Sequence, residues 1–352
     1  MTVRVAIIGA GVLGSAIGRQ LARTGASVTL IDPAPGQGAS AGSLAWLNAS
    51  FASDPVYNAL RKDSMALWRQ LQAEHTDLPV RFPGSILFDD RDVDLAALTG
   101  PAPDQQTAVT ALRSDEVTTL EPDLARPPVH SVHCPADGFG DPAAICDWFL
   151  DQAVQSGAML RREHATQLHN DGGRITRVTT ETGTLATDHV VLAAGIDLPK
   201  LLQRLGLAVA MANQPGLSVR TEPVNRRIQR ILATPEGDLW QGDDGRILIA
   251  NSPRDGETTD QAAARVEASL STLFDTDIAR ETVTQRDRPI PADGRPAVGP
   301  LGPEGLYVVS MHSGMTLAPV MAEMVSHEIM TGVSDTRLAP YRPDRPALGA
   351  GP

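Results

Sequence analysis

Apolar positions open the chain with a nearly continuous run from residue 3 to residue 8. A β-branched run without polar alternation is typical of a strand buried on both faces of a parallel sheet. Residues 15–24 then carry apolar side chains at helical spacing, Gly25 ends that helix, and residues 26–31 form a second apolar run. The pattern predicts a strand, a helix and a second strand in immediate succession.

A glycine-rich turn joins the first predicted strand to the helix. Gly9, Gly11 and Gly14 match G-x-G-x-x-G, in which the glycines make a tight turn, admit a pyrophosphate and allow close helix packing. Asp32 follows the second strand, about 20 residues on, where a carboxylate accepts from a ribose hydroxyl and disfavours a 2′-phosphate. These features predict dinucleotide binding, with NAD and FAD both open at this point.

Alternating patterns farther along predict a second group of elements. Residues 80–88 and 216–224 have the composition of strands, and residues 238–240 and 246–250 that of a hairpin around a turn rich in glycine and aspartate. Residues 259–274 have the apolar spacing of a helix.

Length and charge limit the class of protein. A chain of 352 residues suggests two domains at about 150 residues each. The net charge of −12 argues against nucleic acid as a partner, because phosphate backbones need a basic surface. Two cysteines, Cys134 and Cys146, and a start directly on a strand favour a cytoplasmic, reducing location. Glycine and charge interrupt the apolar runs, which argues against a membrane span.

The segment after the second strand changes the picture, because residues 33–53 are mostly small and polar where an NAD-binding domain would continue into another helix. Within it, residues 44–49 read Leu-Ala-Trp-Leu-Asn-Ala. They resemble the second FAD contact of the D-amino acid oxidase family, which includes glycine and sarcosine oxidases. Residues 172–185 resemble the meander of that family, and residues 188–195 its late Rossmann strand, which ends in a small-residue turn.

A third block near the end of the chain carries the most telling resemblance. Residues 288–300, 305–309 and 312–319 follow the family's order of loop, strand, glycine turn and helix. The backbone N–H groups of residues 313–317 would begin that helix. Its dipole favours the negative charge that reduced flavin develops around N1 and C2=O. The chain therefore resembles an FAD-dependent oxidoreductase of the D-amino acid oxidase family over nearly its whole length.

This resemblance implies an α/β fold, more fully an α+β flavoprotein of two domains. A Rossmann-type FAD-binding domain would comprise residues 1–77, 141–206 and 288–352. A discontinuous substrate-binding domain built on an antiparallel sheet would comprise residues 78–140 and 207–287. The residues expected at FAD are Gly9, Gly11, Val12, Leu13, Gly14, Asp32, Ser40, Ser43, Leu44, Ala45, Trp46, Asn48, Ala165, Ala194, Gly195, Arg288, His312, Ser313, Gly314, Met315 and Thr316.

Four side chains are candidates for the catalytic side of the site. Arg288 matches the family position whose guanidinium grips the substrate carboxylate, the alternative being a structural ion pair with a neighbouring aspartate. His312 is expected at the substrate or the flavin edge, or else as a satisfied core histidine. Trp46 and Trp240 are expected to wall the pocket over the flavin ring, or else to be ordinary core aromatics.

Neither a metal nor a covalent flavin link is expected. The spacing of His130, His133 and Cys134 fits no zinc template, so we interpret these residues as structural. Sarcosine oxidases carry a linking cysteine near the late motif, and this chain has none there. We therefore expect FAD to bind non-covalently.

The resemblance implies an enzyme that oxidises the C–N bond of a small amine or amino acid by passing a hydride to flavin N5, after which water hydrolyses the imine. The lysine that activates oxygen in sarcosine oxidases has no counterpart in residues 246–250. Oxidase and dehydrogenase therefore both stay open, with oxygen or another acceptor taking the electrons. The sheet tyrosine that often binds the carboxylate also lacks an obvious counterpart, which leaves a larger or differently charged amine open.

Three alternatives stay open beside this interpretation. One is a flavin enzyme of the same fold acting on a 2-hydroxy acid, and another is an NAD-dependent dehydrogenase that uses the N-terminal unit alone. The third is a flavin-bearing subunit of a larger complex.

Overall fold

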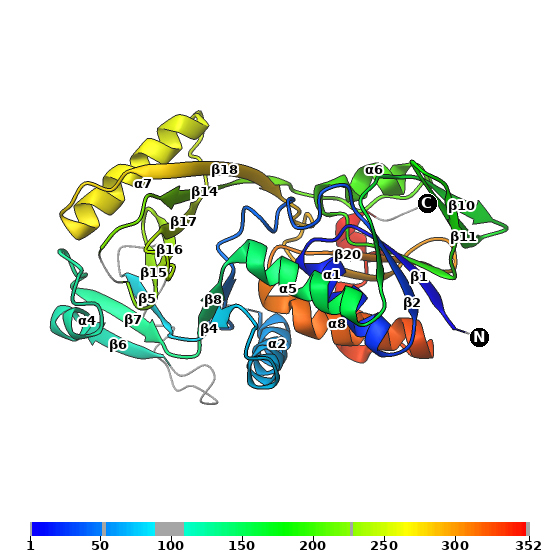
Figure 1. Ribbon diagram of the computed structural model, residues 1–352, viewed down its shortest axis with the longest axis horizontal. Coiled ribbons are helices and arrows are strands. Elements are labelled where there is room, and N and C mark those ends of the chain that lie inside the picture. Colours follow the sequence, from blue (N-terminus) through cyan, green and yellow to red (C-terminus); the bar gives the residue numbers. More distant parts are fainter. Residues whose placement is uncertain (1, 51–53, 89–108, 226–227, 350–352) are drawn as a thin grey trace. The chain divides into compact units, whose positions relative to one another are not determined.

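The computed structural model describes residues 2–50, 54–88, 109–225 and 228–349. The chain divides into two compact units, each assembled from separate stretches of sequence (Figure 1). Unit 1 comprises residues 1–41, 143–214 and 287–352, and unit 2 comprises residues 42–142 and 215–286. This division groups residues 42–77 with unit 2, whereas the sequence led us to expect them among the FAD-binding segments. The functional assignment of the two domains stays a prediction.

Unit 1 is built on a six-stranded sheet whose first two strands are the two apolar runs at the start of the chain. Five neighbouring strands run parallel, as expected for apolar runs buried on both faces, and only the edge strand β19 is antiparallel. Its strands, in spatial order, are β19 (Ala297–Pro300), β20 (Leu306–Ser310), β13 (His189–Leu192), β1 (Arg4–Ile8), β2 (Ser27–Ile31) and β9 (Met159–Arg161).

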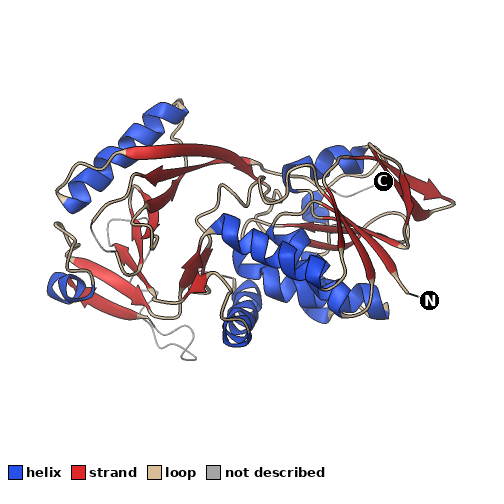
Figure 2. Cartoon of the chain, viewed as in Figure 1, coloured by secondary structure: helices blue, strands red, loops and turns tan. Residues whose placement is uncertain are grey.

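The two faces of this sheet are covered by different elements. Ala6 and Ile8 of β1 share an apolar cluster with helix α6 (Leu198–Gln203) and with the meander β10 (Ala165–Asp171), β11 (Arg174–Thr180) and β12 (Thr184–Ala186). On the other face, helix α1 (Val12–Arg23) packs against helix α8 (Gly314–Thr331). Helix α5 (Pro142–Gln155) and the short helices η1 (Gly195–Asp197), η2 (Thr336–Tyr341) and η3 (Pro346–Leu348) complete the described part of this unit (blue in Figure 2).

Unit 2 is built on an eight-stranded, mainly antiparallel sheet. Only the pair of β15 and β5 runs parallel among the strand pairs described for it. Its strands, in spatial order, are β18 (Arg280–Arg288, which continues into unit 1), β14 (Gln214–Thr221), β17 (Ile247–Asn251), β16 (Gly237–Gln241), β15 (Ile231–Thr234), β5 (Ser85–Phe88), β7 (His130–Cys134) and β6 (Thr110–Arg113).

In the described part of unit 2, a small sheet and three helices accompany the large sheet. The small sheet places β8 (Gly138–Gly140) between β3 (Trp46–Leu47) and β4 (Val80–Arg81). The helices are α2 (Pro55–Glu74), α4 (Ser114–Leu120) and α7 (Thr259–Phe274). One face of α7, including Val266, Leu270 and Phe274, packs into the main core of the unit.

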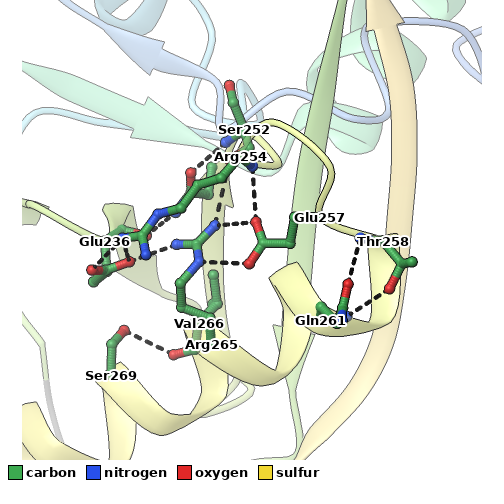
Figure 3. A network of polar contacts seen from close by, with 10 residues as sticks. Glu236, Ser252, Arg254, Glu257, Thr258, Gln261, Arg265, Val266 and Ser269 are labelled. Carbon is green, nitrogen blue, oxygen red and sulfur yellow. Dashed lines mark hydrogen bonds and ion pairs between the residues drawn. The ribbon is translucent and has the colours of Figure 1, made fainter.

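Helix α7 begins in a network of polar side chains (Figure 3). The Thr258 hydroxyl accepts from Gln261 N at 3.3 Å, and the Gln261 side chain accepts from Thr258 N at 2.9 Å, so each caps the other. Arg265 lies between two carboxylates, at 2.5 Å from Glu236 and 2.9 Å from Glu257. The first two turns of the helix are thereby tied to the loop before it and to the turn between β15 and β16.

Most elements expected from the sequence are confirmed, and two are corrected. The helix over residues 259–274 and the hairpin of β16 and β17 form as predicted. The single strand expected over residues 80–88 is wrong, because Pro83 and Gly84, with φ of +91°, separate β4 from β5. The loop expected over residues 288–300 is partly wrong, because Ala297–Pro300 pairs with β20 as an edge strand. In the described ranges, the helices fall short of the length and apolarity that crossing a bilayer requires.

Candidate cofactor and substrate sites

The glycine turn of unit 1 has no room for side chains. Gly9 has φ of +101°, and a Cβ there would lie 2.3 Å from the Ala193 carbonyl oxygen at the end of β13. A Cβ at Gly14 would lie 1.9 Å from the Gly9 carbonyl oxygen. Glycine at position 9 therefore lets the turn approach the end of β13, and glycine at position 14 lets helix α1 approach the turn, as the motif predicts.

The loop after β2 lies against the beginning of helix α1. Val12 N, in the first turn of the helix, donates to Ser40 Oγ at 3.2 Å, and a Cβ at Gly11 would lie 3.0 Å from the same oxygen. Gly11 is the N-cap and has no side chain to satisfy the free amides of the helix. A helix start of this kind fits a pyrophosphate, which the N-terminal amides and the helix dipole favour.

Asp32 is fixed at the carboxyl end of β2. Its Oδ2 accepts from Ala10 N in the glycine turn at 2.7 Å, and its Oδ1 accepts from Ala34 N at 2.8 Å. A carboxylate oxygen has a second lone pair, so these bonds leave room for a ribose hydroxyl. The ribose contact itself stays a prediction.

The late strand and the C-terminal block meet at the same edge of the sheet. A Cβ at Gly9 would lie 3.0 Å from the Ala194 Cα, which places the late-strand turn beside the glycine turn. Gly195 has φ of +57°, and a Cβ there would lie 3.9 Å from Pro289 Cγ. Ser310 Oγ, at the end of β20, donates to the Pro289 carbonyl at 3.4 Å. Segments from the beginning, the middle and the end of the chain thus lie close together in unit 1.

Helix α8 begins at this edge as well. A Cβ at Gly314 would lie 3.4 Å from the Leu13 side chain, so the starts of α8 and α1 are neighbours. Met315 and Thr316 are buried in the first turn of α8, Ser313 is half-buried, and His312 is exposed in the turn before it. The starts of α8 and α1 therefore lie side by side in unit 1.

Arg288 ends β18, next to Pro289. Its guanidinium is partly buried, and burial lowers its pKa from the ordinary value for arginine. Asp293, one of the neighbouring aspartates, pairs with Arg345 at 2.8 Å, and this contact lowers the pKa of Asp293. A substrate carboxylate at Arg288 would offset the cost of burying its charge.

In unit 2, the candidate residues from Ser43 to Asn48 form a tightly held segment. Ala45 has φ of +54°, unusual for a residue other than glycine, and its N–H donates to Ser43 Oγ at 2.9 Å. Trp240 Nε1 donates to the Leu44 carbonyl at 2.8 Å, and its ring stacks on Phe139 with centroids 4.7 Å apart. Trp240 is only 3% exposed, so it packs as a core aromatic. Its role in the substrate pocket stays a prediction.

Trp46 and Asn48 are held by two residues that sequence reasoning missed. Trp46 Nε1 donates to Asp137 Oδ2 at 2.9 Å. Arg61 Nε donates to the Asn48 carbonyl at 3.0 Å, and its Nη2 bonds the Asn48 side chain. Asp137 stands before a glycine in a Pro-Ala-Asp-Gly turn, and Arg61 lies in a polar helix, so both have the sequence setting of surface residues.

One FAD candidate, Ala165, and the two histidines that we interpreted as structural take no part in these contacts. Ala165 begins β10 in the meander and packs against the core of unit 1. His130 and His133 both lie on β7, and burial together with the nearby Arg230 lowers the pKa of His133. Among the described residues, no three His, Cys, Asp or Glu side chains gather as metal ligands would.

The sheet order, the glycine turn and the two adjacent helix starts are those of a Rossmann-type dinucleotide-binding protein. Residues 4–328 match the family model described as FAD dependent oxidoreductase (DAO). The chain belongs to this family, and its cofactor is FAD. The predicted family, fold class and cofactor are confirmed, and the alternative of an NAD-dependent dehydrogenase is set aside.

Individual relatives match along almost the whole chain at low identity. A subunit of the opine oxidase of Agrobacterium tumefaciens is 24% identical, with 96% of each chain covered. Glycine oxidase of Pseudomonas aeruginosa is 25% identical, covering 97% of this chain and 99% of its own. The crystal structure of glycine oxidase from Geobacillus kaustophilus superposes with a TM-score of 0.84 at 24% identity, covering 98% of this chain and 99% of that one.

Proposed function

We propose that this enzyme oxidises the C–N bond of a small amine or amino acid that carries a carboxylate. The observation that carries the proposal is the partly buried Arg288, which adjoins Pro289 and the Gly195 turn at the edge of the sheet where the glycine turn lies. The names of relatives that span the chain, glycine oxidase and D-amino acid dehydrogenase among them, support the same substrate class.

The chain's own residues have three tasks in this reaction. Bound FAD supplies a hydride acceptor at N5. Arg288 would hold the substrate carboxylate through two parallel N–H donors and so orient the C–H bond next to the amine. The amides at the start of α8, from Ser313 to Thr316, would stabilise negative charge on the reduced ring. Water then hydrolyses the released imine to a carbonyl compound and an amine or ammonia.

The size of the amine and the fate of the electrons belong to the same proposal. The relatives named as opine oxidase subunits favour a second candidate, in which the chain is the flavin-bearing subunit of a larger enzyme acting on a bulkier amine. Oxygen or another carrier would reoxidise the flavin, and FAD would be held without a covalent bond. Two buried thiols, Cys134 and Cys146, support a cytoplasmic, reducing location.

Anaerobic bleaching of the flavin tests the proposal directly. Glycine, sarcosine, D- and L-amino acids and N-carboxyalkyl amino acids would be mixed with the purified yellow protein, and absorbance followed at about 450 nm, where oxidised flavin absorbs. We expect at least one amine to bleach the flavin. Bleaching by 2-hydroxy acids and by none of the amines would refute the reaction we propose. Repeating the panel with oxygen separates oxidase from dehydrogenase.

A further inference from the structure

A fully buried carboxylate lies beside Trp46 in unit 2. Asp137 is 0% exposed, and three donors converge on it. Its Oδ2 accepts from Trp46 Nε1 at 2.9 Å and from Ser85 Oγ at 2.7 Å, and its Oδ1 accepts from Ser50 Oγ at 3.2 Å. Three convergent donors are the environment of an ionised carboxylate, which accepts hydrogen bonds and donates none.

The charges around Asp137 only partly compensate its burial. Arg61 from α2 acts on it through space, while the hydrogen bonds of that guanidinium go to Asn48. Arg69 from the same helix donates to the Ala136 carbonyl at 2.9 Å. Cys134, at the end of β7, has a thiol pKa raised by burial and by Asp137. Burial outweighs the donors and Arg61, and it raises the pKa of Asp137 to about 7.

The backbone next to Trp46 is strained. Ala45 is buried and adopts φ of +54°, a left-handed conformation that costs about 1 kcal/mol or more in a residue other than glycine. Such a residue persists only when its surroundings fix it. Trp240 Nε1 fixes the carbonyl of Leu44 on one side, and Asp137 fixes the indole of Trp46 on the other. Strain held in place in this way is typical of functional sites.

We propose that Asp137 is a positioning residue that locks the Trp46 indole as a wall of the substrate pocket when ionised and loosens it when protonated. The pocket role of Trp46 rests on the proposed function. A protonated Asp137 must donate its proton to one of its neighbours, so it offers fewer acceptor sites to the three groups that converge on it. Substrate binding should therefore weaken as the pH falls through neutrality.

Nitrogen-15 spectra of the tryptophan indoles in the FAD-loaded protein test the lock without any substrate. The chain has four tryptophans, and Trp46→Phe identifies the Trp46 resonance. We expect that resonance to titrate with a midpoint at about 7, and to stop titrating in Asp137→Asn. The Trp240 indole, bonded to a backbone carbonyl, is the control and should move far less. A Trp46 resonance that does not titrate, or that titrates equally in Asp137→Asn, would overturn the proposal.

Steady-state kinetics test the second part of the proposal, that Trp46 forms a wall of the substrate pocket. In the wild type, KM for a substrate found by flavin bleaching should be lower at about pH 8 than at about pH 6. Asp137→Asn mimics the protonated residue, so it should raise KM at the higher pH about 3- to 10-fold, with kcat changed less than about twofold. Asp137→Ala, which loses every acceptor, should be worse than Asp137→Asn.

The outcomes separate this inference from the proposed function. If the Trp46 resonance titrates but KM follows the same pH profile in the wild type and in Asp137→Asn, the pocket role is wrong and amine oxidation stands. If no amine bleaches the flavin, the proposed function fails and the pocket role of Trp46 fails with it. The indole spectra still decide whether Asp137 holds Trp46.

Discussion

At the scale of single residues, Arg288 carries the substrate prediction. Arg288→Ala should raise KM for carboxylate substrates 10-fold or more, because a charge-assisted pair to a carboxylate contributes about 2 kcal/mol. Steady-state kinetics on the best substrate of the bleaching panel measure this. Arg295→Ala is the matched control, since Arg295 is an exposed arginine a few residues farther along the chain. Equal KM in both variants would return Arg288 to a structural role.

Gly14 offers a test of the cofactor site. A methyl group there would collide with the Gly9 carbonyl, so Gly14→Ala must move helix α1 away from the turn. We expect the purified variant to contain less than about a tenth of the wild-type flavin, because the pyrophosphate contacts depend on that approach. Flavin-to-protein absorbance ratios measure the content. Gly38→Ala, in the same unit with nothing within 4 Å of its Cβ position, should retain FAD. Full flavin in both would contradict the assignment.

Asp137 should also make stability depend on pH. Its folded-state pKa of about 7 lies above its value near 4 in an unfolded chain, so the folded protein binds more protons. Its contribution is fully present below about pH 4 and is lost as the pH rises to about 7, a fall of up to about 4 kcal/mol. Asp137→Asn should remove this slope.

Urea unfolding of both proteins at about pH 5 and about pH 8 checks this expectation. The free energy of unfolding of the wild type should fall from the lower to the higher pH by more than that of Asp137→Asn. Asp151→Asn, at an exposed position, serves as the control. The same pH slope in the wild type and in Asp137→Asn would refute it.

The residue types of the cofactor turn could be predicted because the structural requirements at these positions are local in sequence. Gly9 and Gly14 are required by a tight turn and a helix contact within a few residues of each other, and Asp32 follows directly from a strand end. Asp137 lies 91 residues from Trp46, and only the fold brings them together. A lone aspartate before glycine is usually a surface turn, so nothing in the sequence distinguishes this buried one.

At the scale of elements, prediction succeeded where the residues that begin or end a helix or strand lie next to it in the sequence. Helix α7 has its own capping pair in Thr258 and Gln261, and the hairpin of β16 and β17 has its own turn. The edge strand β19 was missed because it follows a run rich in proline and glycine. Its pairing depends on β20, and the Pro300 ring at its end is tolerated because the strand lies on the sheet edge.

The network at the start of α7 predicts a difference between two arginines. Arg265 is 15% exposed and pairs with Glu236 and Glu257, whereas Arg254 is 62% exposed. Arg265→Ala should lower the free energy of unfolding by about 1 to 2 kcal/mol, because it leaves carboxylates without a partly buried partner. Arg254→Ala should cost less, about 0 to 1 kcal/mol, as for exposed pairs. Chemical denaturation compares the two, and a larger loss in Arg254→Ala would contradict the expectation.

At the scale of the whole molecule, we expect FAD to join segments that the sequence separates. The candidate cofactor contacts of unit 1 come from all three of its stretches. Binding to the folded state alone should stabilise the protein by about 2.7 kcal/mol when free FAD is about 100 times its Kd. Stripping FAD should therefore lower Tm, and adding it back should restore Tm. Riboflavin lacks the pyrophosphate and adenosine, so it should restore far less, and equal recovery would argue against pyrophosphate binding at α1.

The segmented sheet of unit 1 also has a consequence for synthesis of the protein. β1 and β2 leave the ribosome first, but β13 and β20, which lie on the other side of β1, are translated much later. At ordinary elongation rates the interval between β1 and β20 is roughly 15 to 60 s. Throughout that time one apolar edge of the growing sheet lacks its neighbouring strand. The first turn of α8 has not yet been synthesised. The predicted FAD contacts at the start of α8 can therefore form only after both β13 and β20, and we expect the unfinished chain to need protection from aggregation.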